Sequence, residues 1–206
     1  MKRAKVVVIG GGTFNHISCH LSLAAPAFGN TARYFAGTYK SMGIDVELIL
    51  TKMADPINSK IVTNGDLLNK MIELVEDKDI KVLVMNAAVC DFEMENPSDE
   101  SRLSSSKEYT GQLKGLKSKF VGWFKSQRPD VTVVAFKTTH GAAWTTQLSK
   151  AALSLENNGA DIVIANDVGK RNNLIITKDG FMEQESRSYI LAKAVALSLE
   201  MAGFSL

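Results

Sequence analysis

The chain has 206 residues, of which 45% are apolar and 22% are charged. These values are ordinary for a globular protein and exclude extensive disorder, collagen and a long coiled coil. The 24 basic and 22 acidic residues nearly balance, and a net charge of +2 gives no signature of nucleic-acid or membrane binding. The only cysteines, Cys19 and Cys90, lack the spacing of a zinc site, which favours a reduced, cytoplasmic protein.

Strands and helices alternate along the sequence. In chain order we predict a strand at Val6–Ile9, a helix over Thr31–Ser41, a strand at Val46–Leu50, a helix with an apolar stripe from Leu67 to Val75, a strand at Val82–Met85, a helix with a stripe from Leu113 to Phe124, a strand at Val131–Phe136, a helix with a stripe from Trp144 to Leu155, strands at Ile162–Ala165 and Leu174–Thr177, and a helix with a stripe from Ile190 to Met201. Asn30 and Asp66 are residue types that begin helices.

The first five strands are nearly continuous in apolar residues, as expected where both faces of a mainly parallel sheet are covered. The sequence therefore predicts an α/β fold: a three-layer, Rossmann-like domain over residues 1–206, with a mostly parallel sheet and helices on both faces. The first apolar run is too short for a secretion signal, and no run approaches the about 20 residues that span a bilayer.

Residues 92–107 are polar, rich in serine, and carry no helical or strand pattern. A loop of this length in a compact domain is often a lid over a binding site. On composition alone, a solvated connector fits equally well.

Ligands of open parallel sheets bind beyond the carboxyl ends of the strands. The first predicted strand is followed by Gly10, Gly11, Gly12 and Thr13, where glycines permit close approach and successive N–H groups can hold an anion. Asn15 stands where the dinucleotide fingerprint has its third glycine, and no P-loop lysine follows. The run indicates phosphate or nucleotide binding, and the alternative is a tight turn without a ligand.

Two further strand ends carry candidate site residues. Ala87 and Ala88 leave room for a planar ligand, and Asp91 supplies a carboxylate that could hold a hydroxyl or Mg²⁺. Asn166 and Asp167 follow the fifth strand. The alternatives are close packing of the alanines and polar residues that only form turns.

Basic residues concentrate between residues 107 and 128. They are Lys107, Lys114, Lys117, Lys119, Lys125 and Arg128. One or two of them could bind a triphosphate, whereas most lysines of this kind form the solvated face of a helix.

Several motifs occur together in the order of one family. They are Gly10–Thr13, Asn30 before a helix, Ala87–Phe92, Arg102–Ser106, Ala135–Thr139 and Asp161–Val168. On these motifs the chain resembles phosphopantothenoylcysteine synthetase, also called phosphopantothenate–cysteine ligase, of coenzyme A biosynthesis.

The resemblance implies a two-step ligation of 4′-phosphopantothenate and cysteine through an acyl-nucleotide. It implies CTP or ATP as co-substrate, Mg²⁺ as cofactor and a homodimer. The synthetase is often fused to a flavin-dependent decarboxylase, but nothing in this chain resembles that half, so flavin is not expected.

Residue roles carry over by position. The resemblance implies that Asn30 contacts the acyl-phosphate intermediate, that Asp91 lies on the nucleotide side, and that Phe136 lines the base or ribose pocket. It implies nucleotide contacts also for the Gly10–Thr13 run, the paired alanines, and Asn166 and Asp167.

The sequence departs from the family at its cations. Arg102 stands at the position of the family's catalytic lysine, with Lys107 five residues on, and either could serve. Lys150 is the nearest match to lysines before the Asp161 strand, and Thr31–Arg33 replaces the usual Ser-Ser-Gly. These departures leave open a catalytically inactive nucleotide-binding protein of the same fold.

A short-chain dehydrogenase is the other alternative. Asn86–Val89 resembles that family's Asn-Asn-Ala-Gly, and Tyr189 and Lys193 match its Tyr-x-x-x-Lys. The glycine spacing and the long interval between these motifs argue against it.

Overall fold

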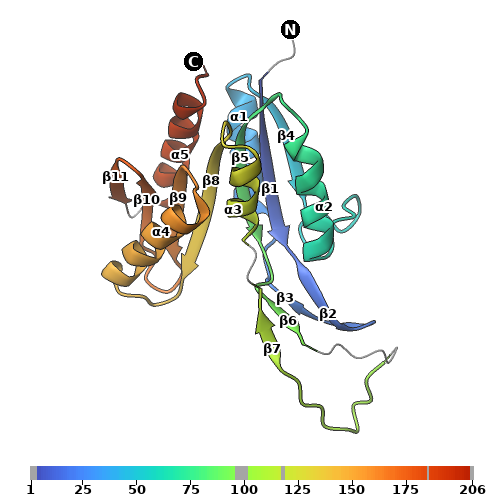
Figure 1. Cartoon of the computed structure of the whole chain (residues 1–206). Helices are drawn as coiled ribbons and strands as arrows, with labels where there is room; N and C mark the ends of the chain where they lie inside the picture. Colours follow the sequence, from blue (N-terminus) through green and yellow to red (C-terminus); the bar gives the residue numbers. More distant parts are fainter. Residues whose placement is uncertain (1–3, 96–101, 117–118, 185, 205–206) are drawn as a thin grey trace.

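The computed structural model describes residues 4–95, 102–116, 119–184 and 186–204. Its centre is a seven-stranded sheet in the order β11-β10-β9-β8-β5-β1-β4 (Figure 1). The strands are β1 (Lys5–Gly12), β4 (Asp45–Leu50), β5 (Ile80–Ala88), β8 (Thr132–Thr139), β9 (Ile162–Asp167), β10 (Asn173–Thr177) and β11 (Gly180–Gln184). The strands from β4 to β9 run parallel, whereas β10 and β11 are antiparallel additions at one edge.

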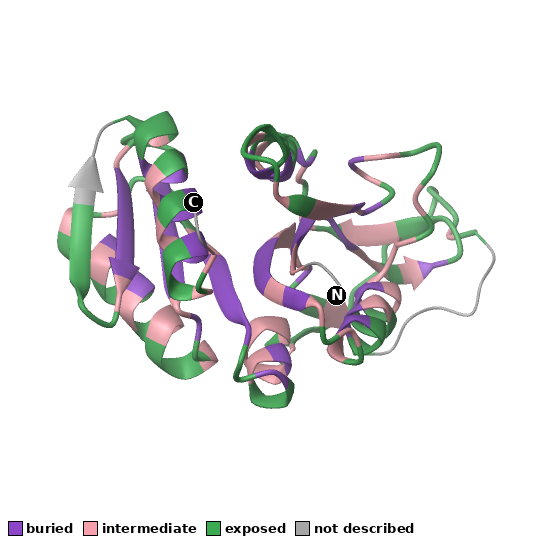
Figure 2. Ribbon diagram, turned by 90° about the horizontal axis from the view of Figure 1, so that it is seen from above, coloured by how far each residue is buried: buried purple, intermediate pink, exposed green. Residues whose placement is uncertain are grey.

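Helices cover both faces of this sheet, which confirms the predicted three-layer, Rossmann-like fold. On one face, α1 (Asn30–Ser41) and α5 (Arg187–Met201) pack on alternate strand residues such as Val6 and Ile164. On the other face lie α2 (Asn64–Val75), α3 (Phe120–Gln127) and α4 (Trp144–Asn158). Seen from above, burial concentrates in the strands between the helices (Figure 2). No helix in the described ranges is long and apolar enough to cross a membrane.

Two predicted helix starts are wrong by a few residues. Gly29, with a φ of 76°, caps α1, and Asn30 is the first helical residue. Thr63 caps α2, because its hydroxyl accepts from the Asp66 N–H while the Asp66 carboxylate accepts from the Thr63 N–H at 2.8 Å. Asp66 is therefore the third residue of a capping box, a pattern that shares its residue types with a simple cap.

The stripe from Leu113 to Phe124 is not one helix. Leu113 begins β7 (Leu113–Gly115), which pairs with β6 (Phe92–Met94), and α3 begins only at Phe120. A second ribbon, β2 (Phe14–Ser18) with β3 (Leu21–Ala24), projects beside it beyond the sheet (Figure 1). The predicted loop over 92–107 thus begins as a strand, and its residues 96–101 lie outside the described residues.

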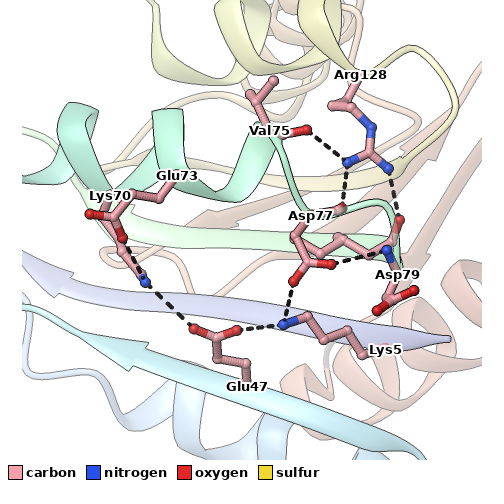
Figure 3. Close-up of polar contacts among 9 residues, drawn as sticks. Lys5, Glu47, Lys70, Glu73, Val75, Asp77, Asp79 and Arg128 are labelled. Carbon is pink, nitrogen blue, oxygen red and sulfur yellow. Dashed lines mark hydrogen bonds and ion pairs between the residues drawn. The ribbon is translucent and has the colours of Figure 1, made fainter. Parts of the chain in front are cut away.

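A polar cluster holds the amino end of the sheet together (Figure 3). Lys5 Nζ contacts carboxylate oxygens of Glu47 at 2.8 Å and of Asp77 at 2.7 Å. Against the opposing effect of burial, these two carboxylates raise the pKa of Lys5 to about 12. Arg128, one of the basic residues considered for triphosphate binding, lies at this edge with 3% of its side chain exposed. It is therefore far from the carboxyl end of the strands, where ligands of this fold bind.

Candidate functional site

A cleft of about 580 Å³ opens at the carboxyl end of the sheet. The ends of β5, β8 and β9 form its floor, and the first turns of α1, α3 and α5 contribute to its walls. Its polar and charged lining residues are Asn30, Thr31, Asn86, Asp91, Lys119, Lys137, Thr138, Ser154, Asn158, Asn166 and Arg187. The cleft lies where this fold binds ligands, because the strand order reverses between β1 and β5. The connection from β1 to β4 passes through α1 on one face of the sheet, and the connection from β5 to β8 passes through α3 on the other.

The cleft extends to both faces of the sheet at the carboxyl ends of the strands. Successive strand residues point to opposite faces, so Phe136 and Lys137 of β8 lie on different sides. The Phe136 ring packs edge-on against Phe35 of α1, with centroids 5.9 Å apart. Lys137 shares the face of Ala135, which belongs to the core beneath α4. Phe136 therefore lines the side of α1 and α5, and Lys137 lines the other side; the base or ribose contact of Phe136 stays a prediction.

Asn30 occupies the first turn of α1 at the cleft wall. No side chain caps this helix, and the Asn30 amide has no hydrogen-bond partner among the described residues. The amide and the uncapped N–H groups are consequently available to a ligand.

The glycine run lies under the site rather than in its lining. Gly10 packs directly on Ala32 of α1, and a side chain at residue 10 would overlap the Ala32 Cβ. Gly11 has a φ of +104°, and the Gly12 N–H donates to the Ala27 carbonyl at 2.8 Å. These glycines let α1 and the segment before it approach β1, and their predicted contact with a nucleotide stays a prediction.

Thr13 is buried and belongs to a network that fixes the turn after β5. Its hydroxyl donates to Asn64 Oδ1 at 2.6 Å and accepts from the Cys90 N–H at 2.9 Å. The Cys90 carbonyl accepts from Asn64 Nδ2 at 2.8 Å and from Asn15 Nδ2 at 3.1 Å. Because the backbone N–H and carbonyl of Cys90 are both hydrogen-bonded, the position of the backbone at the neighbouring Asp91 is fixed.

Ala87, Ala88 and Asp91 all line the cleft. The Asp91 side chain is 60% exposed, and its Oδ1 accepts from Lys119 Nζ at 3.1 Å. Asp91 is the one acidic residue among the described lining residues. Its carboxylate is therefore accessible to a ligand, and the exposed pair with Lys119 contributes little to stability.

Asn166 and Asp167 have different surroundings. Asn166 lines the cleft, and its Oδ1 accepts from Thr138 Oγ1 at 3.3 Å. Asp167 is buried, and both its oxygens accept hydrogen bonds within the protein. The donors are the N–H groups of Lys170, Gly141, Gly169 and Ala142 and the Thr139 hydroxyl. Asp167 thus ties together the loops that follow β8 and β9.

These hydrogen bonds give a testable pH dependence. The hydrogen bonds hold the pKa of the Asp167 carboxyl far below its usual range, although burial opposes this shift. The bond from the Lys170 N–H has the largest effect. An unfolded aspartate titrates near ~3.9, so this carboxylate contributes stability above that pH and loses it as the pH falls towards its folded pKa. We expect Asp167→Asn to lower the midpoint of urea unfolding at pH 7 and to flatten its decline below pH 4. A variant that declines as steeply as the wild type would contradict this role.

Three predicted cations do not line the cleft. Arg102 and Lys107 are exposed in the segment before β7. Lys150 is exposed on α4, one turn before Ser154, which does line the cleft. Their contacts with a nucleotide stay predictions. Lys117 lies outside the described residues.

The cations that do line the cleft are Lys119, Lys137 and Arg187. Lys119 belongs to the basic segment and Lys137 to the Ala135–Thr139 motif, so both lie in parts of the sequence that indicate a binding site. Arg187 lies outside every motif, and its proximity to Thr31 comes only from the packing of α5 beside α1.

Other candidates have structural roles or lie elsewhere. Arg33, which departs from the family pattern, donates to the carbonyls of Phe28 at 2.7 Å and Ala54 at 2.6 Å, and so fixes the cleft loop before α1. Tyr189 and Lys193, the dehydrogenase motif, are not among the lining residues. The structure therefore gives no support to the dehydrogenase alternative.

Curated relatives come from two archaea, and each is named coenzyme A biosynthesis bifunctional protein CoaBC. The protein of Methanocaldococcus jannaschii is 28% identical over 170 residues, and that of Thermococcus kodakarensis is 27% identical over 166 residues. The alignments cover 81% and 79% of this chain but 41% of each relative. The chain thus spans about two fifths of the length of these relatives.

Solved structures share the fold. The DNA/pantothenate metabolism flavoprotein from Streptococcus pneumoniae superposes with a TM-score of 0.78 at 24% identity, covering 96% of this chain and 97% of that chain. The C-terminal domain of CoaBC gives 0.72 at 17% identity, with coverage of 97% and 95%. A Cab2 variant in complex with phosphopantothenate-cysteine gives 0.69 at 15% identity, with coverage of 98% and 88%.

The family is shown by a match over nearly the whole chain. Residues 1–200 match the DNA/pantothenate metabolism flavoprotein C-terminal domain. This match includes every motif on which the sequence resembles the phosphopantothenoylcysteine synthetases, and it confirms that resemblance. The chain therefore belongs to the family of the DNA/pantothenate metabolism flavoprotein C-terminal domain.

Proposed function

We propose that this chain ligates 4′-phosphopantothenate and cysteine at the expense of CTP or ATP, as a step of coenzyme A biosynthesis. The observation that carries the proposal is the cleft at the carboxyl end of the sheet. It brings Asn30, Asp91 and Phe136, the residues to which the family resemblance gives roles, together with three cations. The names of the archaeal relatives and the ligand of the Cab2 complex point to the same chemistry.

The proposed reaction has two steps at one centre. The carboxylate oxygen of 4′-phosphopantothenate attacks the α-phosphorus of the nucleotide, pyrophosphate leaves, and an acyl-nucleotide forms. The cysteine nitrogen then attacks the acyl carbon, and the nucleoside monophosphate leaves. Such chemistry depends on orienting two anionic substrates and stabilising a crowded phosphate. An uncapped helix start, an unpaired amide and lining cations are suited to this task.

The site residues also fit Mg²⁺. This ion takes oxygen ligands and is commonly held by one or two carboxylates together with substrate phosphates. Asp91 would hold it from the protein side, and no described group of three or more acidic, cysteine or histidine side chains forms a site made by protein alone. Bound Mg²⁺ would neutralise charge on the triphosphate. Flavin has no part in the proposal.

A pyrophosphate-release assay tests the proposed function. Each nucleotide is supplied in turn with 4′-phosphopantothenate, with and without cysteine. We expect pyrophosphate release that requires 4′-phosphopantothenate, and an amide product with a free thiol only when cysteine is present. Tight nucleotide binding without release would instead favour the catalytically inactive alternative. Light scattering of the same sample tests the homodimer that the family resemblance implies.

Asp91→Asn should weaken the use of nucleotide and Mg²⁺ while leaving the fold intact. The loss of one charge-assisted contact should cost about 1.5–3 kcal/mol of binding, whereas the exposed pair with Lys119 contributes at most about 1 kcal/mol to folding. The Km for nucleotide as a function of Mg²⁺ concentration measures the first effect, and urea unfolding the second. Lys119→Gln, which breaks the same pair, is the matched control for the unfolding measurement. Unchanged kinetics in Asp91→Asn would remove this carboxylate from the site.

We further propose that the segment at 92–107 serves as a lid that brings Arg102 or Lys107 to the phosphates. Closure would keep water from an activated acyl-nucleotide before cysteine attacks. Replacing both cations by alanine should abolish nucleotidyl transfer, and replacing one should leave partial activity if they share the role. Nucleotide with Mg²⁺ should also slow tryptic cleavage after Lys107. Full activity of the double variant would reduce the segment to a connector.

A further inference from the structure

Arg187 has an unusual position for a cation. It is the first residue of α5, half-buried, and lies in the wall of the cleft. Its Nη2 donates to Thr31 Oγ1 at 3.2 Å, which links the first turns of α5 and α1. No described carboxylate lies within ion-pair distance of its guanidinium.

Two effects oppose a positive charge at the start of α5. A helix carries a partial positive charge at its N-terminus, where acidic side chains are favoured and cations are not. Burial also lowers the pKa of the Arg187 guanidinium, because removal from water disfavours its charged form. A residue that breaks the local rules without a compensating contact among the described residues is expected at a functional site.

Two neighbouring cations already have partners, and a third lies on the other face of the sheet, which sets Arg187 apart. Lys119 pairs with Asp91, and Arg33 donates to two backbone carbonyls. Lys137 lies on the other face of the sheet, the face that α4 covers. On the side of α1 and α5, Arg187 is therefore the described lining cation that has no carboxylate partner among the described residues. Its hydrogen-bond partner Thr31 directly follows Asn30, which lines the same cleft.

We infer that Arg187, with the Thr31 hydroxyl and the first turn of α1, binds a phosphate group of a phosphorylated substrate. The planar guanidinium suits two oxygens of one phosphate. The phosphate is either that of the nucleotide or that of the acyl substrate, since both are anionic phosphate esters. The assignment of a substrate rests on the proposed function, whereas phosphate binding by Arg187 does not.

The test is calorimetric titration of the full chain with CTP, ATP, 4′-phosphopantothenate and, as the phosphate-free control, pantothenate. Arg187→Gln should raise the Kd of the nucleotides or of 4′-phosphopantothenate by about ten- to a hundredfold and leave pantothenate binding unchanged. The ligand that is weakened identifies the source of the phosphate. Arg187→Lys should recover part of the loss, because it keeps the charge but not the planar fork.

Lys40→Gln is the matched control, since it removes one exposed positive charge at the far end of α1. It should bind every ligand as the wild type does, and circular dichroism should show that all three variants are folded. Unchanged phosphate binding in Arg187→Gln, equal weakening of pantothenate, or a wild-type chain that binds none of the phosphates would overturn the inference. Phosphate binding that depends on Arg187 in a chain without ligase activity would refute the proposed function alone.

Discussion

Asn30→Asp should lower the turnover of the proposed ligation by about a hundredfold or more, the range measured when one preorganised donor to a developing anion is lost. The Asn30 amide can donate to an acyl-phosphate oxygen, whereas an aspartate at the same place would repel it. The effect should appear in kcat more than in Km, because charge is most crowded at the reacting phosphorus. Single-turnover measurements of pyrophosphate release would isolate this step.

The same substitution should leave the fold as stable as before, or more so. Asn30 is the first residue of α1, and a carboxylate in the first turn of a helix contributes about 0.3–1 kcal/mol. Asn30→Ala serves as the control that removes the donor without adding charge, and its turnover should lie between those of the wild type and Asn30→Asp. Normal turnover in the aspartate variant would restrict residue 30 to a role in beginning the helix.

The sheet could be predicted from the sequence because its central strands are buried on both faces. Val6–Ile9 and Ile162–Ala165 are continuous apolar runs, and they lie in the sheet as predicted. The ribbons β2–β3 and β6–β7 were missed because they are short, and the polar residues in them give no two-residue alternation that separates them from loops. The apolar residue Leu113 belongs to such a ribbon, although its spacing from Phe120 fits a helix.

The site was predictable in part for a different reason. Strand ends meet at one edge of a parallel sheet, so Asp91 and Asn166 could be placed near each other without coordinates. The glycine run was ambiguous, because close packing against Ala32 and close approach of a phosphate both require residues without side chains. Arg187 lies 156 positions from Thr31, and no local pattern predicts a contact over that distance.

Arg128→Met should be among the most destabilising single substitutions in this chain, with an expected loss of about 2–4 kcal/mol in the free energy of unfolding. The guanidinium donates to the carbonyls of Val75 at 3.2 Å and Asp77 at 2.7 Å (Figure 3). It also donates to the Ile80 carbonyl at 3.1 Å. Methionine fills similar space but donates nothing, so each carbonyl loses its bond from the guanidinium, between the end of α2 and the start of β5. The Val75 carbonyl would keep the contact from Lys78 Nζ at 3.2 Å, and the Asp77 carbonyl the one from the Ile80 N–H at 3.4 Å. The midpoint of urea unfolding should fall without a change in slope.

Asp130→Asn separates the carbonyl contacts from the ion pair. Arg128 also donates to both oxygens of the Asp130 carboxylate, at 2.8 and 2.9 Å, but the Asp130 side chain is 53% exposed, and water therefore weakens the pair. The asparagine variant should therefore lose less stability than Arg128→Met. Nucleotide affinity of folded Arg128→Met should equal that of the wild type, because the cluster lies at the opposite end of the strands from the cleft. Weaker nucleotide binding by Arg128→Met with unchanged stability would instead indicate that Arg128 binds phosphate. Equal losses of stability in Arg128→Met and Asp130→Asn would show that the ion pair, rather than the carbonyl contacts, stabilises this end of the sheet.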